Sequence, residues 1–111
     1  MPTAAATLDI EHFRAMTGDD PALQAELREL FAAQAVLWRR LLVSDAPVQT
    51  WRDAAHTLKG SARGLGLWAL ADACLAVENA ARSGRREGPM IAAALEKART
   101  ALDDALEALC G

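Results

Sequence analysis

The sequence predicts an all-α protein, an antiparallel up-down bundle of four helices with a short additional helix at its N-terminus. Hydrophobic residues make up 52 % of the chain, yet Tyr is absent and Phe occurs only twice. Ala and Leu dominate instead, and these are helix formers rather than the β-branched and aromatic residues that favour sheets. Turn signals divide the chain into one short and four longer segments. At 111 residues we expect one domain over 1–111, with 1–7 as a flexible tail.

The predicted turn between the first two helices contains residues that end one helix and residues that begin the next. The short helix covers about 9–17, and Gly18 ends it. Asp20 then supplies a carboxylate cap and Pro21 the first position of a helix that reaches about Val43. Its core side is predicted to carry leucines at helical spacing, namely Leu23, Leu27, Leu30, Leu37 and Leu41.

The last three helices begin and end at similar signals. Ser44-Asp45-Ala46-Pro47 repeats the cap-then-Pro pattern and opens the third helix, whose apolar stripe is Val48, Trp51, Ala55, Leu58 and Ala62. Glycines at 64 and 66 break or bend the chain before the fourth stripe, which is Leu67, Leu70, Cys74, Val77 and Ala81. The last helix starts near Gly88-Pro89 and is predicted to bury Ile91, Leu95, Ala98, Leu102, Leu106 and Leu109. Short connections between such helices favour an up-down bundle.

Charge and composition exclude several classes of function. The net charge of −3 gives no general attraction for nucleic acid or anionic lipid. The two cysteines fit neither a disulfide framework nor a zinc motif, and His12 has no partner at metal-ligand spacing, so we expect no metal. Neither a signal peptide nor a run of 18 apolar residues is present. We therefore expect a cytoplasmic monomer that binds neither membrane nor nucleic acid.

His56 is the residue most clearly set apart by the pattern of the third helix. At 100° per residue it lies roughly 130° from the centre of the apolar stripe, so it should face solvent. Arg52, Lys59, Gly60 and Arg63 share its side of the helix. An ordinary solvated face is the alternative, but a mid-helix glycine costs about 1 kcal/mol and indicates a packing or access requirement.

A clearance beside an exposed imidazole has a chemical use. Neutral imidazole, whose pKa is ordinarily about 6.5, is a nucleophile at cellular pH, and phosphoryl transfer to it needs room for an in-line approach. Lys59 and Arg63 are candidates to hold phosphoryl oxygens. Arg52 either adds to this field or is a solvated surface arginine.

The stretch from Ala55 to Gly66, AHTLKGSARGLG, closely resembles the signature of bacterial histidine phosphotransfer domains. In that signature a phosphorylated histidine is followed by Leu-Lys-Gly-Ser and, further on, by a glycine, here Gly64. The resemblance extends to residues 18–21 and to the helix around Val77. It implies phosphorylation of His56 on its outer ring nitrogen.

The same resemblance implies charge stabilisation by Lys59 and access past Gly60. It also places an acceptor for the inner ring nitrogen at Glu78, which follows the core residue Val77 just as His56 follows Ala55. An exposed glutamate paired with Arg82, four residues on, is the alternative for Glu78.

The resemblance implies a phosphocarrier rather than an enzyme, placed between a hybrid sensor histidine kinase and response-regulator receiver domains. The receiver would bring Mg²⁺ and the acceptor aspartate, so this chain needs no cofactor or ATP site of its own. Docking on the short helix is expected at His12, Phe13 and Met16, although core capping is an equal reading for its apolar residues. A bundle that binds partners without relaying phosphate, and a helical nucleic-acid binder, are the competing functions.

Overall fold

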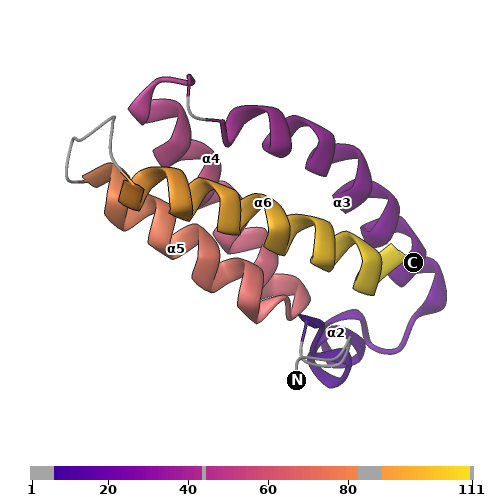
Figure 1. Cartoon of the computed structure of the whole chain (residues 1–111). Helices are drawn as coiled ribbons and strands as arrows, with labels where there is room; N and C mark the ends of the chain where they lie inside the picture. The colour runs from indigo at the N-terminus through magenta and orange to yellow at the C-terminus, as the bar shows by residue number, and fades with distance from the viewer. Residues whose placement is uncertain (1–6, 44, 83–88, 111) are drawn as a thin grey trace.

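The computed structural model describes residues 7–43, 45–82 and 89–110, and this part of the chain folds into five helices. They are α2 (Ile10–Thr17), α3 (Pro21–Leu41), α4 (Val48–Leu65), α5 (Trp68–Arg82) and α6 (Pro89–Cys110). Figure 1 shows the four long helices side by side, successive ones pointing in opposite directions, with α2 at one end. No strand occurs within the described ranges, so the all-α prediction is confirmed. The predicted tail lies, except for Thr7, outside those ranges.

Most helix ends follow the predicted signals. Asp20 accepts hydrogen bonds from the backbone N–H groups of Ala22 and Leu23, which caps α3. Gly66 ends α4 in the left-handed conformation at φ 84°, and a Cβ there would lie 3.0 Å from the carbonyl oxygen of Asp9. Glycine is therefore required at this position for both conformation and space.

The start of α4 differs from the prediction. Pro47 is the cap residue itself, with φ −60° and ψ 148°, and makes no side-chain cap hydrogen bond. Proline lacks an N–H group and favours extended backbone just outside a helix, so it delimits the start of α4. Ser44, part of the predicted cap, lies outside the described residues.

The core is built mainly from α4, α5 and α6, and their stripes are confirmed. The largest fully buried side chains include Trp51 and Leu58 of α4, Leu70 and Val77 of α5, and Leu102 of α6. Two predicted members, Val48 and Leu106, are only partly buried at the edge of the core. None of the described helices is long and apolar enough to cross a bilayer.

The predicted core face of α3 is wrong. The helix buries a different stripe, made by Phe31, Ala35 and Trp38 and continued by Leu42 just after the helix. Of the predicted leucines, three are exposed and two are partly buried; Leu23, Leu30 and Leu37 are exposed by 36 %, 55 % and 56 %, and Leu27 and Leu41 pack at the edge of the core. Helix α3 therefore carries a second apolar face that the bundle leaves open.

Polar contacts hold α2 against the start of α5 and the end of α4. The N–H of Asp9 donates to the carbonyl of Gly66 at 2.8 Å, and Trp68 Nε1 donates to Asp9 Oδ2 at 3.0 Å. His12 Nε2 lies 3.1 Å from the carbonyl oxygen of Gly64, and its ring contacts Trp68 edge-on at 4.9 Å between centroids. Helix α2 is thus positioned at the C-terminal end of α4.

Candidate functional site

His56 lies at the middle of α4 and faces solvent. It is the ninth of the helix's 18 residues, and its side chain is 74 % exposed. The neighbours Ala55 and Leu58 on the same helix are fully buried, so the orientation of His56 follows from the apolar stripe, as predicted. A ring in this position is open to a second protein and contributes little to the core.

Glu78 of α5 lies behind the imidazole. Its Oε2 is 3.5 Å from Nδ1 of His56, and its side chain is only 10 % exposed. This distance is long for a hydrogen bond but short for an electrostatic contact. A carboxylate facing Nδ1 favours the tautomer with its proton there, which leaves the lone pair of Nε2 directed at solvent.

Lys59 of α4 pairs with Glu78. Its Nζ lies 2.7 Å from Oε1 of Glu78, and its side chain is 13 % exposed. The ammonium group therefore neutralises the carboxylate beneath the imidazole. Across the α4–α5 interface Glu78 forms an ion pair with Lys59 and lies close to Nδ1 of His56; it forms no ion pair with Arg82 on its own helix.

Acid should remove the contribution of this ion pair to stability. Burial alone raises the pKa of Glu78, but the Lys59 ammonium and then His56 outweigh burial and hold the pKa of that carboxyl below its usual value of 4.5. A lowered pKa stabilises the folded protein above the unfolded pKa, and this contribution is lost as pH falls through the folded value.

We therefore expect Glu78→Gln to melt several degrees below wild type at pH 7, corresponding to about 1–3 kcal/mol for an orphaned partner. The two melting temperatures should converge as the pH falls through the lowered pKa of Glu78, because the wild-type carboxyl then becomes neutral as well. Thermal melts of both proteins, recorded about every pH unit between pH 3 and pH 7, measure this convergence. Equal melting temperatures at pH 7 would show that the pair does not stabilise the fold.

Gly60 and Gly64 carry no side chain on the part of α4 that follows His56. A Cβ at either position would meet nothing within 4 Å, so neither glycine is required by packing inside this chain. Gly60 interrupts the interior of α4, where glycine is unfavourable by about 1 kcal/mol relative to alanine, whereas Gly64 lies in its last turn. The packing explanation for Gly60 is therefore excluded.

The two predicted arginines take separate places. Arg52 lines an open polar groove together with His56 and Glu78. Arg63 is exposed on α4, two turns beyond His56. Arg82 was not among the predicted site residues, although it lines the same groove as Arg52. The spacing of four residues between Glu78 and Arg82 could have indicated that both side chains lie on the same face of α5.

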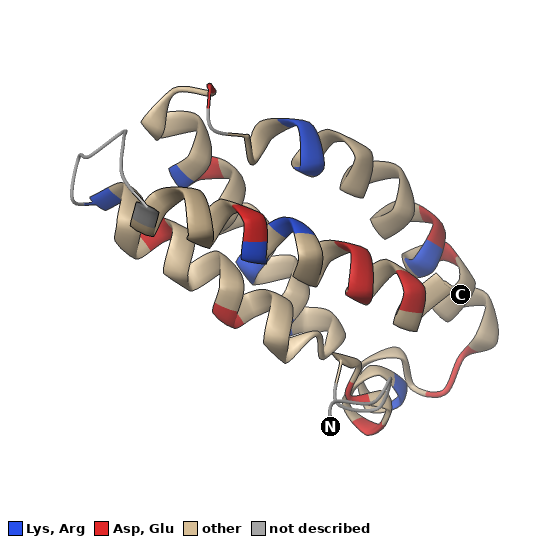
Figure 2. Ribbon diagram, in the orientation of Figure 1, with Lys and Arg blue, Asp and Glu red and all other residues tan. Residues whose placement is uncertain are grey.

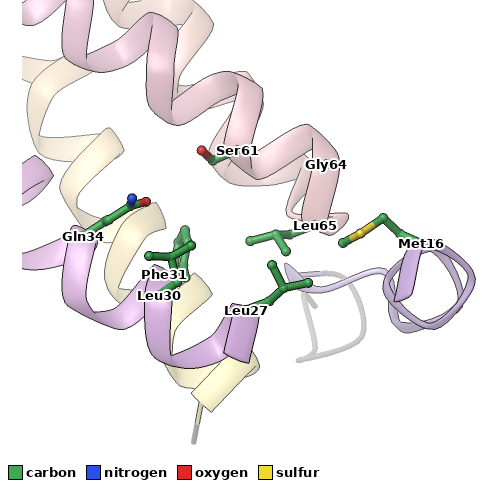
Figure 3. Close-up of a pocket in the computed structure, with 8 residues that line it drawn as sticks. All are labelled: Met16, Leu27, Leu30, Phe31, Gln34, Ser61, Gly64 and Leu65. Atoms are coloured by element: carbon green, nitrogen blue, oxygen red, sulfur yellow. The ribbon is translucent and has the colours of Figure 1, made fainter. Parts of the chain in front are cut away.

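The three predicted docking residues of α2 separate into three environments. Phe13 is fully buried and belongs to the core, so its predicted role as a surface contact is wrong; the capping alternative holds for it. His12 is held by Gly64 and Trp68, as described above. Met16 is 42 % exposed and borders an apolar groove between α2, α3 and α4 (Figure 3).

Two other chemistries find no support in the residues described. Burial, reinforced by Glu78, raises the pKa of the Cys74 thiol to about 12, so this thiol is not a nucleophile at neutral pH. No group of three His, Cys, Asp or Glu side chains suited to a metal ion occurs within the described ranges. Figure 2 shows basic and acidic positions interspersed along the described helices.

An all-helical protein with an exposed imidazole, a buried acceptor behind it and a clear approach beside it has the features of a histidine phosphocarrier. A comparison with protein-family models matches residues 19–111 to the Hpt domain. The chain belongs to this family, which has a histidine-containing phosphotransfer role in two-component signalling. Comparisons with curated proteins and with solved structures gave no match.

Proposed function

We propose that this chain is a phosphorelay intermediate, which accepts a phosphoryl group on Nε2 of His56 and donates it to aspartates of receiver domains. The observation that carries the proposal is the exposed imidazole with its Nδ1 facing the buried carboxylate of Glu78 at 3.5 Å. We further propose that the chain acts as a single module, a cytoplasmic monomer built as an antiparallel up-down four-helix bundle. It works without an ATP site of its own.

Transfer to His56 follows from the lone pair on Nε2. This nitrogen attacks the phosphorus of an aspartyl phosphate; the N–P bond forms as the P–O bond breaks, and the carboxylate leaves. Because Nδ1 keeps its proton, the imidazole becomes cationic as the bond forms. The negative charge of Glu78 stabilises that cation, and the Lys59 ammonium keeps Glu78 ionised. Mg²⁺ is supplied by the receiver in this proposal.

The receiver domain is proposed to dock over the face of α4 that carries His56, Gly60 and Gly64. The neighbouring apolar groove, lined by Met16, Leu30 and other residues of α2, α3 and α4 (Figure 3), offers a modest apolar contact beside it. A relay protein must release each partner, so we expect an interface near or below about 1,200 Å². A hybrid sensor kinase supplies the phosphoryl group through its own receiver.

This docking face is tested by NMR titration with an unphosphorylated receiver. We expect amide perturbations at His56, Lys59, Gly60 and Arg63 and in the segment from His12 to Thr17. The exposed surface of α6 serves as the internal control, because it lies on another side of the bundle. Perturbations confined to α6 would place the docking face elsewhere.

The function itself is tested with purified receiver domains phosphorylated on aspartate. Acid-labile, base-stable phosphate should appear on this chain and decline when an unphosphorylated second receiver is added. A protein that only binds receivers, the competing function, would form a complex without becoming labelled.

A further inference from the structure

An open polar groove lies along the α4–α5 interface on the N-terminal side of His56. His56 and Glu78 line one part of it, and Arg52 of α4 and Arg82 of α5 line another. The two helices run in opposite directions (Figure 1), and His56 contacts Glu78 across their interface. Arg52, four residues before His56, and Arg82, four residues after Glu78, are therefore displaced to the same side by one turn.

Lys59 is the cation nearest to His56 in the sequence, but its side chain does not line this groove. Lys59 is held at 2.7 Å by Glu78, and its side chain is 13 % exposed, whereas that of His56 is 74 % exposed. A phosphoryl group on Nε2 projects into solvent, away from the Lys59–Glu78 pair. Its oxygens carry about two negative charges at neutral pH, so other cations have to compensate them.

The two arginines are available for this task. Within the described ranges, no ion pair involves Arg52 or Arg82. Asp53 also lines the groove, and its negative charge repels an anion. Its Oδ1, however, accepts a hydrogen bond from Gln49 Nε2 at 2.8 Å. Lys59 compensates Glu78, so the two guanidinium groups leave the groove with an excess positive charge.

We propose that Arg82, together with Arg52, binds the phosphoryl oxygens of phosphorylated His56 from the two sides of this groove. The inference rests on the proposed function and deepens it, because it assigns phosphoryl binding to a residue of α5. Guanidinium groups suit the task, since they stay charged and form paired hydrogen bonds with phosphate oxygens. Lys59 acts from below as a positioning residue, through Glu78 and the imidazole.

The test uses phosphoramidate, a small donor that needs no receiver. Nε2 of His56 attacks phosphorus, the N–P bond to the ring forms as the donor's P–N bond breaks, and ammonia leaves from the zwitterionic donor. We expect Arg82→Gln to slow labelling of His56 about tenfold, corresponding to roughly 1.4 kcal/mol for one lost charge-assisted contact. Arg82→Lys should recover part of the rate, because charge remains without the paired geometry.

Arg40→Gln is the matched control. It removes one positive charge from an exposed position on α3, so its labelling rate should stay within about twofold of wild type. Melting temperatures within a few degrees of wild type exclude unfolding as the cause, since Arg82 is exposed in the last turn of α5.

The outcomes separate the two proposals. If Arg82→Gln is labelled as fast as Arg40→Gln, Arg82 does not bind the phosphoryl group, and the proposed function stands. If Arg82→Lys is labelled at a rate between those of Arg82→Gln and wild type, the charge at this position acts on the phosphoryl group and the assignment is supported. If the wild-type protein takes no label on His56 from phosphoramidate or from any phosphorylated receiver, the proposed function fails, and this inference fails with it.

Discussion

Replacing His56 with glutamine is expected to abolish labelling by a phosphorylated receiver, a loss of all detectable transfer. Glutamine keeps the polarity and helix propensity of the position but cannot form the phosphohistidine. The stability should change by less than about 0.5 kcal/mol, because the imidazole is 74 % exposed and removes little apolar area from water. Autoradiography of acid-labile phosphate and a thermal melt measure the two effects.

His12→Gln is the matched control for this experiment. His12 is the other histidine of the chain, and its ring lies against Gly64 and Trp68, so the substitution should lower stability modestly while phosphate is still detected on the chain. Phosphate retained by His56→Gln would refute the assignment of the phosphorylation site, even if the His12 variant were labelled normally.

Gly60→Leu is expected to separate stability from function. Leucine is a better helix former than glycine by several tenths of a kcal/mol or more, and a Cβ at this position meets nothing within 4 Å. The melting temperature should therefore rise slightly. Transfer from a receiver should nevertheless slow by up to about a hundredfold, because the new side chain occupies the approach to His56 and displaces the partner.

Two controls identify obstruction as the cause of the slower transfer. Ala93→Leu introduces the same side chain at an exposed position of α6 and should leave transfer unchanged. Labelling by phosphoramidate, which is far smaller than a receiver, should be affected less than labelling by the receiver. A receiver transfer rate within about twofold of wild type would contradict the access role of Gly60.

The sequence predicted the structure best where a single local signal determines a helix end or a buried face. Asp20 and Gly66 mark helix ends through local backbone chemistry, and the leucine-containing and valine-containing stripes predicted for α4 and α5 are buried, apart from Val48 at the edge of the core. Helix α3 is different, because it has two apolar stripes with helical spacing. Its aromatic stripe with Phe31 and Trp38 fills the core, and the leucine stripe stays at the surface. Periodicity alone does not choose between two such faces, whereas packing against neighbouring helices does.

The same limit applies to the site. The exposure of His56 followed from its angle on one helix. The adjacency of Glu78 was implied by the resemblance to histidine phosphotransfer domains and agreed with its position directly after a core residue. The Lys59–Glu78 contact at 2.7 Å and the facing positions of Arg52 and Arg82 depend on the axial register of α4 against α5. That register is set by how the buried side chains of both helices interdigitate, and the sequence pattern of either helix alone does not predict it.

The position of His56 at the middle of one helix face also constrains the kinetics of the proposed relay. A donor and an acceptor would both have to cover the same imidazole, so they cannot be bound at the same time. Exchange must then proceed by a double-displacement scheme, in which the phosphorylated chain leaves the first partner before it meets the second. Double-reciprocal plots at different acceptor concentrations should be parallel, and an excess of unphosphorylated acceptor should inhibit by occupying the chain before it is charged.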